Sequence, residues 1–303
     1  MSSRRGGRVL HLKKSKIFTF YLLDGIPLMI ALINSFAVRP FFWRLGRRLY
    51  CWARREVASG FEAGGEYWLL QSVLAVADRS KLTIFLDIGA HKGVWAEGAT
   101  SLLRRQNLPG RVYAFEPASS TFAYLSEKFK GSDLVSLNRI ALSDRSGEQE
   151  FFVVGELAGT NSLVRSGDAT TEDVHTLRLD DYLGVERIDH VLFVKSDTEG
   201  HDFSVLLGAV ETLRRGRIDV WQFEYNHRWI GQRSFLKDVF DFIADKPYRL
   251  GKLYGNGIEV YDKWHPELER FFESNYVLIR KGSCFERLCS RVHFSNSNVL
   301  MPD

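Results

Sequence analysis

Residues 83–117 read TIFLDIGAHKGVWAEGATSLLRRQNLPGRVYAFEP, and this stretch decides the expected fold. Thr83–Asp87 and Arg111–Phe115 are short apolar runs, which are typical of buried β-strands. Between them, the apolar residues of segment 94–103 recur at helical spacing. A strand, a glycine-containing loop, a helix and a second strand therefore follow one another, as in a parallel β-α-β unit.

The same alternation continues along the rest of the chain. Further strands are expected at 134–142, 148–154, 190–195 and 219–223, and helices at 66–77, 122–129, 203–213 and 235–243. An antiparallel pair at 257–261 and 275–279 is expected to close the sheet. The pattern predicts an α/β fold with an open, mostly parallel sheet and helices on both faces. Ligands of such sheets bind outside the carboxyl ends of the strands.

The predicted strand ends carry glycines and acids. In the loop after the first strand, Gly89 and Gly93 allow the backbone to turn tightly before a helix. Their G-x-x-x-G spacing differs from the G-x-G-x-x-G of dinucleotide-binding loops. An acid also lies at or near the end of each of five strands, and these acids are Asp87, Glu116, Asp144, Asp197 and Glu224.

This row of carboxylates discriminates between two cofactors. A nicotinamide dinucleotide brings an anionic pyrophosphate, whereas S-adenosyl-L-methionine brings a sulfonium and an ammonium group. A rim of carboxylates attracts the second and repels the first. Glu116, 27 residues after Gly89, is also placed to accept hydrogen bonds from ribose hydroxyls. The residues therefore favour S-adenosyl-L-methionine, with an NAD(P)-dependent Rossmann oxidoreductase as the alternative.

Several short motifs follow in order over residues 85–229. They are FLDIGAHKG (85–93), FEP (115–117), NRIALSD (138–144), GTNSL (159–163), LRLDDYL (177–183) and KSDTEGHDFSVLLGA (195–209). In these motifs the chain resembles the FkbM family of S-adenosylmethionine-dependent methyltransferases. The last motif, K-x-D-x-E-G followed by a helix with L-x-G-A, is the most specific. Ser196 departs from the family, which usually has an aliphatic residue there.

The resemblance implies a class I methyltransferase fold and methyl transfer, commonly to oxygen on sugars or secondary metabolites. Asp87 and the loop after it are then expected at the methionine end of the cofactor. Glu116 is expected on the ribose, and Asp144 on the adenine amino group. The residues expected to bind the cofactor are Asp87, Gly89, Ala90, His91, Gly93, Glu116, Pro117, Leu142, Ser143, Asp144 and Asp197.

A hydroxyl acceptor is a poor nucleophile, so its reaction benefits from a base that takes the proton. The catalytic candidates are Asp197, Glu199, His201 and Glu224. Asp197 is expected near the methyl group, with Glu199 or His201 as the proton acceptor. No metal is assigned to the favoured site. In an alternative, Asp197, Glu224 and Asn226 bind Mg²⁺, although hydrogen bonds to substrate explain the same residues.

A long polar segment, residues 155–175, is expected to be a lid or binding loop. Within it, Thr160, Asn161 and Ser162 are candidates for hydrogen bonds to the hydroxyls of a small-molecule or glycan acceptor. The preference for oxygen over nitrogen as the accepting atom rests on the family resemblance alone.

The composition is that of a globular protein, with 45% hydrophobic and 26% charged residues, which excludes a disordered or fibrous chain. Three cysteines cannot form a disulfide framework, so a reducing compartment is favoured. Residues 1–55 contain twelve Lys and Arg against one acid, a net charge of +11, so residues 56–303 carry −7 of the total of +4. The basic segment predicts contact with an anionic surface.

Residues 17–38 are mostly apolar and about long enough to span a bilayer. Asp24 and Pro27 oppose a regular span, which favours an interfacial or re-entrant anchor. A true span, a cleaved signal peptide and a helix packed on the protein's own core are alternatives. Residues 1–60 are thus expected to form a basic helical arm, and residues 61–303 the methyltransferase domain.

The arm predicts a cytoplasmic protein at the inner membrane surface, docked on anionic lipid through residues 1–55. A nucleic-acid partner is not expected, because the basic residues lack interleaved aromatic stacking motifs. A non-catalytic membrane-docking module with a methyltransferase-like fold is a further alternative, and the acids at every strand end oppose it.

Overall fold

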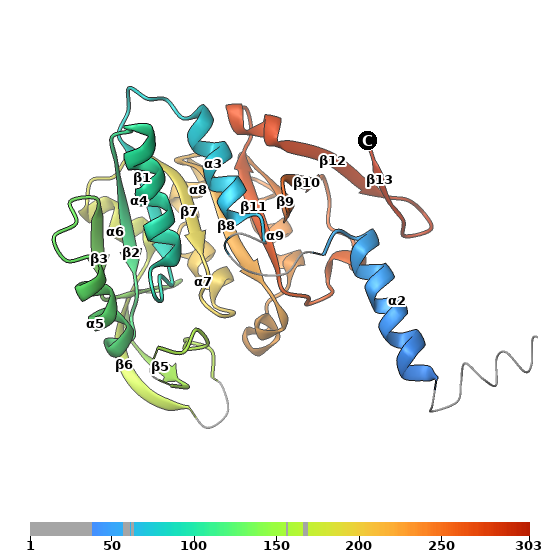
Figure 1. Ribbon diagram of the computed structural model, residues 1–303, viewed down its shortest axis with the longest axis horizontal. Helices are drawn as coiled ribbons and strands as arrows, with labels where there is room; N and C mark the ends of the chain where they lie inside the picture. Colours follow the sequence, from blue (N-terminus) through green and yellow to red (C-terminus); the bar gives the residue numbers. More distant parts are fainter. Residues whose placement is uncertain (1–37, 57–60, 62–63, 156, 166–168) are drawn as a thin grey trace, which may run out of the picture. The chain divides into compact units, whose positions relative to one another are not determined.

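The computed structural model describes residues 38–56, 61, 64–155, 157–165 and 169–303 (Figure 1). The chain divides into two compact units, Met1–Arg55 and Glu56–Asp303. In the first unit, α2 (Arg39–Ala53) has a proline in its first turn, where no backbone N–H is needed, and none of its residues is buried. Apart from Val38, the predicted apolar segment 17–38 lies outside the described residues.

In the part of the chain that the structure describes, the second unit is built on a sheet of ten strands. The strands are β13 (Leu300–Pro302), β12 (Cys289–Phe294), β10 (Gly257–Tyr261), β9 (Tyr248–Tyr254), β11 (Ser274–Arg280), β8 (Ile218–Tyr225), β7 (Val191–Ser196), β1 (Thr83–Ile88), β2 (Gly110–Phe115) and β3 (Val135–Asn138). The block from β8 to β3 is parallel, and β11 is antiparallel to both of its neighbours. This confirms the predicted α/β class with a largely parallel sheet.

The strand order places a crevice at the centre of the parallel block. β1 lies between β2, which follows it in the chain, and β7, which comes about a hundred residues later. Every residue of β1 and β7 is buried, as expected for central parallel strands covered on both faces. The loops after β1 and β7 leave the sheet side by side, and this is where a ligand is expected to bind.

Helices cover both faces of the sheet (Figure 1). The helices are α3 (Glu66–Val76), α4 (Val94–Gln106), α5 (Ser119–Lys128), α6 (Leu179–Val185), α7 (Asp202–Leu207), α8 (Val210–Arg214) and α9 (Leu236–Ile243), with 3₁₀ turns η1 (His227–Gln232), η2 (Pro266–Leu268) and η3 (Cys284–Leu288). On one face, α3 and α4 pack around Phe85 of β1. The neighbouring Leu86 packs among the helices of the opposite face, because successive strand residues point in opposite directions.

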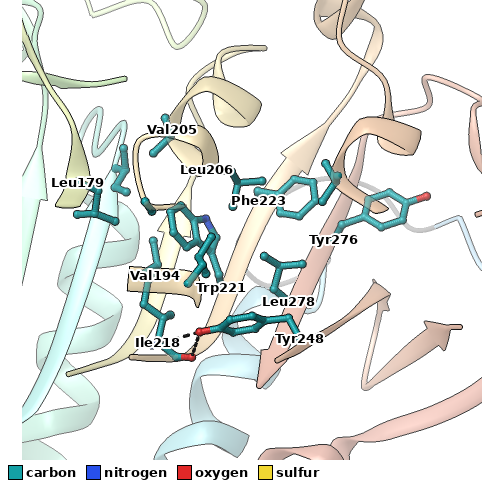
Figure 2. Packing of buried hydrophobic residues seen from close by; sticks show 14 of the residues in the cluster. Leu179, Val194, Val205, Leu206, Ile218, Trp221, Phe223, Tyr248, Tyr276 and Leu278 are labelled. Atoms are coloured by element: carbon teal, nitrogen blue, oxygen red, sulfur yellow. Dashed lines mark hydrogen bonds between the residues drawn. The ribbon is translucent and has the colours of Figure 1, made fainter. Parts of the chain in front are cut away.

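The core on the second face is aromatic at its centre. Figure 2 shows Trp221 and Phe223 of β8 packed among residues of α6, α7 and the neighbouring strands. Two buried polar atoms there are hydrogen-bonded: the Tyr248 hydroxyl donates to the Ile218 carbonyl at 2.7 Å, and Trp221 Nε1 donates to Ser196 Oγ at 3.1 Å. Satisfying these groups lets large amphipathic side chains fill the interior without unpaired polar atoms.

A second, small sheet departs from the sequence predictions. Residues 134–142 are not one strand, because β3 ends at Asn138 and β4 (Ala141–Leu142) pairs with β6 (Thr170–Leu177). β6 also pairs with β5 (Gly147–Val153). Because β6 begins at Thr170, the loop is shorter at its carboxyl end than the expected segment 155–175. The residues of β6 are too polar for their alternation to be identified as a strand in the sequence.

The predicted closing pair was wrong in its pairing. Residues 257–261 and 275–279 are strands, but β9 lies between them and pairs with both β10 and β11. Gly251 made β9 hard to recognise as a strand in the sequence. The structure shows why this position is a glycine. A Cβ there would lie 2.5 Å from the Ile258 side chain, so a larger residue would collide with the neighbouring strand.

Candidate active site

One cavity of about 330 Å³ opens at the carboxyl edge of the parallel strands. Its wall is formed by the loops after β1, β2 and β7, the end of β8 and the short strand β4. Most of the residues expected from the sequence to bind cofactor or catalyse transfer line it. These are Gly89, Ala90, His91, Glu116, Pro117, Leu142, Asp197, Glu199, His201 and Glu224.

The loop after β1 is tightly connected to its neighbours. The backbone N–H groups of Gly89 and Ala90 both donate to the Phe115 carbonyl at 3.0 Å, and Asp197 N–H donates to the Ile88 carbonyl at 3.0 Å. Gly89 has a φ of +77°, and a Cβ there would lie 2.1 Å from the Asp197 carbonyl oxygen. Only glycine fits this approach of two backbones.

Glu116 joins the loops after β1 and β2. Its carboxylate accepts hydrogen bonds from His91 N–H at 2.9 Å and Ala118 N–H at 3.0 Å. Burial raises the pKa of Glu116 to about 7, although these two hydrogen bonds favour the charged form. The carboxylate is thus oriented by the backbone and lines the cavity, where its remaining lone pairs are available to hydroxyl donors.

Asp87 and Gly93 do not line the cavity. Asp87 is fully buried beneath the loop, where it accepts a hydrogen bond from Ala96 N–H in the first turn of α4 at 3.2 Å. Burial raises its pKa to about 6. Gly93 has a φ of +69° and precedes α4, tightly packed against Phe129 and Leu125. Both residues therefore support the loop beside the cavity, and their expected contact with the cofactor stays a prediction.

Lys195 is a buried cation beside the cavity. Its Nζ lies 3.2 Å from Asp197 Oδ2. Burial lowers the pKa of Lys195, but the charges of Asp197 and Asp87 outweigh burial and raise it above its usual range. The lysine therefore stays charged and orients the Asp197 carboxylate at the end of β7.

Glu199 occupies a strained position in the loop after β7. Its φ is +56°, which is uncommon for a residue with a side chain, and the following Gly200 has a φ of +99°. Arg228 of η1 forms an ion pair with the Glu199 carboxylate. Burial and the charge of Asp197 raise the pKa of Glu199 to about 7, and the charge of Arg228 opposes them.

Glu224 lies opposite this loop, near the end of β8. Burial, followed by the charges of Asp197 and Glu199, raises the pKa of Glu224 to about 10, so this carboxyl is protonated at neutral pH. Asn226 Nδ2 donates to Glu224 Oε2 at 2.5 Å, while Asn226 Oδ1 accepts from Arg228 N–H at 2.8 Å.

The Asn226 amide therefore has partners on both sides, and it does not line the cavity. This does not fit the alternative in which its oxygen binds Mg²⁺. Among the residues that the structure describes, no group of three His, Cys, Asp or Glu side chains is arranged to hold a metal ion.

His201 is buried at the adenine side expected from the sequence. Ser143 Oγ donates to Asp144 Oδ1 at 2.9 Å, so the 2.9 Å contact between Ser143 Oγ and His201 Nε2 requires the imidazole to donate. Burial lowers the pKa of His201 to about 4, and the ring is neutral at pH 7. Its Nδ1 is then an acceptor, and it has no hydrogen-bond partner among the described residues.

Ser143 and Asp144 do not line the cavity. Ser143 is fully buried behind His201, and Asp144 is exposed. Both follow the two residues of β4, and their expected contact with adenine stays a prediction.

Two acids and an amide on the far wall of the cavity were not predicted from the sequence. Glu66 of α3, Glu273 and Asn275 line the cavity, and Asn275 Nδ2 donates to Glu66 Oε1 at 3.2 Å. β11 is antiparallel to β8, with Ser274 opposite Tyr225, so the start of β11 meets the end of β8 at the same edge. Knowing that β11 runs antiparallel to β8 would have placed Glu273 at the cavity. Strand direction cannot be read from the local periodicity of the sequence.

The loop between β5 and β6 closes another side of the cavity. Asn161 lines it, but Thr160 and Ser162 do not. Ser162 is buried, and its hydroxyl donates to the Thr198 carbonyl at 2.9 Å. Ser162 was predicted to contact acceptor hydroxyls, but its hydroxyl instead joins this loop to the loop after β7.

The strand order, the glycine loop after β1 and the acid after β2 define a class I methyltransferase-like fold. The chain belongs to the methyltransferase FkbM domain family, whose family model matches residues 87–250. This confirms the family that the sequence resemblance predicted.

Solved structures with a similar fold include other methyltransferases. Methyltransferase FkbM from Methylobacillus flagellatus KT shares 14% identity and a TM-score of 0.44, over 70% of this chain and 47% of that one. The chain thus spans about half the length of that protein. The N-terminal domain of human METTL16 shares 12% identity and a TM-score of 0.42, over 75% of this chain and 73% of that domain. No curated protein sequence matches the chain.

Membrane association was also expected from the sequence. None of the helices in the described part of the chain is both long and apolar enough to cross a membrane.

Proposed function

We propose that this chain is an S-adenosylmethionine-dependent methyltransferase, and that it methylates a hydroxyl oxygen of a sugar, a glycolipid or a secondary metabolite. The observation that carries the proposal is the single cavity that Glu116, Asp197, Glu199 and Glu224 share. Hydroxyl groups donate to carboxylates, and the protonated Glu224 is itself a donor to acceptor oxygens. An acceptor rich in hydroxyls therefore complements the wall, whereas a phosphorylated acceptor meets the Asp197 carboxylate and, as they lose their protons near pH 7, the carboxylates of Glu116 and Glu199.

The same wall fits S-adenosyl-L-methionine, which supplies an electrophilic methyl group when it is bound. Gly89 and Ala90, with Asp197 opposite, would hold the methionine end, and Glu116 would accept hydrogen bonds from the ribose. Leu142 lies on the adenine side expected from the sequence. The unpartnered Nδ1 of His201 supports the same assignment, because a buried acceptor without a partner is costly unless a ligand donates to it.

The residue best placed to take the acceptor's proton is Glu199. A general base works best when its pKa lies near the working pH, and the pKa of Glu199 is about 7. As the methyl carbon bonds to the acceptor oxygen and its bond to sulfur breaks, the hydroxyl proton would pass to the Glu199 carboxylate. His201 is a weaker candidate, because its Nε2 is occupied by Ser143 and its pKa is about 4.

Two measurements test the proposal. Calorimetry with S-adenosylmethionine, S-adenosylhomocysteine and NADH should show binding of the first two alone. Binding of NADH without a response to S-adenosylmethionine would support the oxidoreductase alternative. The protein is then incubated with methyl-labelled cofactor and sugar or lipid extracts, and the products are identified by mass and fragmentation. A label found on nitrogen would overturn the assignment to oxygen, and no labelled product despite cofactor binding would favour the non-catalytic alternative.

A further inference from the structure

Helix α2 of the first unit has an apolar stripe that the structure leaves exposed. The stripe consists of Phe41, Leu45, Leu49 and Trp52, which recur at intervals of three and four residues and so share one face of the helix. Trp52 is 81% exposed and Phe41 62% exposed. Large apolar side chains gathered in this way mark a surface that is covered in the working protein.

The arginines of α2 border this stripe along one side of the helix. The arginine face consists of Arg44 with Arg47 and Arg48, which follow it by three and four residues. Arg39 begins the helix, Arg54 and Arg55 follow it, and residues 38–55 contain no acid. A surface that complements both the stripe and the arginine face is therefore apolar and anionic.

We propose that α2 lies in the interface of an anionic lipid bilayer. Fifteen residues of helix extend about 22 Å, which is too short to cross the apolar core but suits a helix lying in the membrane plane. The apolar stripe enters the acyl boundary, and the arginine face contacts anionic headgroups. Trp43 lies beside Arg47, whose guanidinium is 5.4 Å from the centre of its ring.

Charge complementarity selects lipid over the other surfaces that might cover the helix. Nucleic acid neutralises arginines but leaves the apolar stripe in water. A second copy of α2 covers the stripe but brings a second set of arginines without acids. An anionic bilayer satisfies both faces at once, and each arginine near such a surface strengthens binding about fivefold.

Vesicle sedimentation of the full chain tests the proposal. Vesicles of phosphatidylcholine mixed with phosphatidylglycerol should bind the wild type, and vesicles of phosphatidylcholine alone should bind it much less. Arg44→Gln, Arg47→Gln and Arg48→Gln combined should weaken binding about 10²-fold. Leu49→Asp with Trp52→Asp should weaken it at least tenfold, because two charges would enter the acyl boundary.

The matched control is Val185→Asp, which places a charge on an apolar residue of α6 that is 77% exposed. It should leave vesicle binding unchanged. All variants should still bind S-adenosylhomocysteine, which shows that the second unit is folded and separates this test from that of the proposed function. Wild-type binding that the α2 substitutions leave unchanged would overturn the proposal, as would a dimer that forms through α2 without binding vesicles.

Discussion

Gly89 provides the sharpest test of how the candidate site is built. In Gly89→Ala, the new Cβ would lie 2.1 Å from the Asp197 carbonyl oxygen and 3.0 Å from its carbon. Ordinary contact begins near 3.4 Å, so the loops after β1 and β7 must separate by about 1.3 Å. They are held together by the hydrogen bond from Asp197 N–H to Ile88, which this movement would break.

The expected cost has two parts. The left-handed φ costs an alanine about 1–2 kcal/mol, and overpacking adds about 1–3 kcal/mol to the loss of folding stability. Gly131 separates the cost of the backbone conformation from the cost of overpacking. It has nearly the same φ, +75°, but no described atom lies within 4 Å of the place that its Cβ would take. Gly131→Ala should therefore lose only the first part, about 1–2 kcal/mol.

Urea unfolding gives the stabilities of both variants, and calorimetry with S-adenosylhomocysteine gives their affinities. Gly89→Ala should bind the cofactor product at least tenfold more weakly, and its turnover should fall about 10²-fold, since displacement of positioning groups by about 1 Å has effects of this size. Gly131→Ala should match the wild type in both. Equal losses in the two variants would refute the reasoning, because the close approach to Asp197 would then have no effect.

The remaining predictions concern charge at the cavity. Turnover should rise with pH through about 7 as Glu199 loses its proton, and Glu199→Gln should abolish that limb of the pH–rate profile. Arg228→Gln should move the limb to higher pH, since the arginine lowers the pKa of Glu199; a shift to lower pH would contradict the assignment. Glu116→Gln should weaken S-adenosylhomocysteine binding at least tenfold, whereas Glu172→Gln, which alters the exposed partner of Ser119, should not. His201→Phe should narrow the difference in calorimetric affinity between S-adenosylhomocysteine and its inosine analogue, which lacks the adenine amino group; an unchanged ratio would remove His201 from base recognition.

The sequence predicted the centre of the fold well, because the signals there are local. The strands around residues 83–87, 111–115, 190–195 and 219–223 are apolar runs between helical patterns, and a residue's neighbours along the chain decide such patterns. The pairing of β10 with β9 was missed, since two strands with similar patterns do not indicate which one lies between them. Strand order depends on contacts between distant segments.

Within the candidate site, sequence determined that acids follow the parallel strands, and topology alone brings Glu116, Asp197 and Glu224 to one edge. Only the tertiary structure decided which way each carboxylate faces. Asp87 turns beneath its loop to hold α4, Asp144 faces solvent, and Glu273 enters the cavity from an antiparallel strand. The physical reason is that an acid's position in the chain determines at which end of a strand it lies. The orientation and the pKa of its side chain depend on the side chains that pack around it.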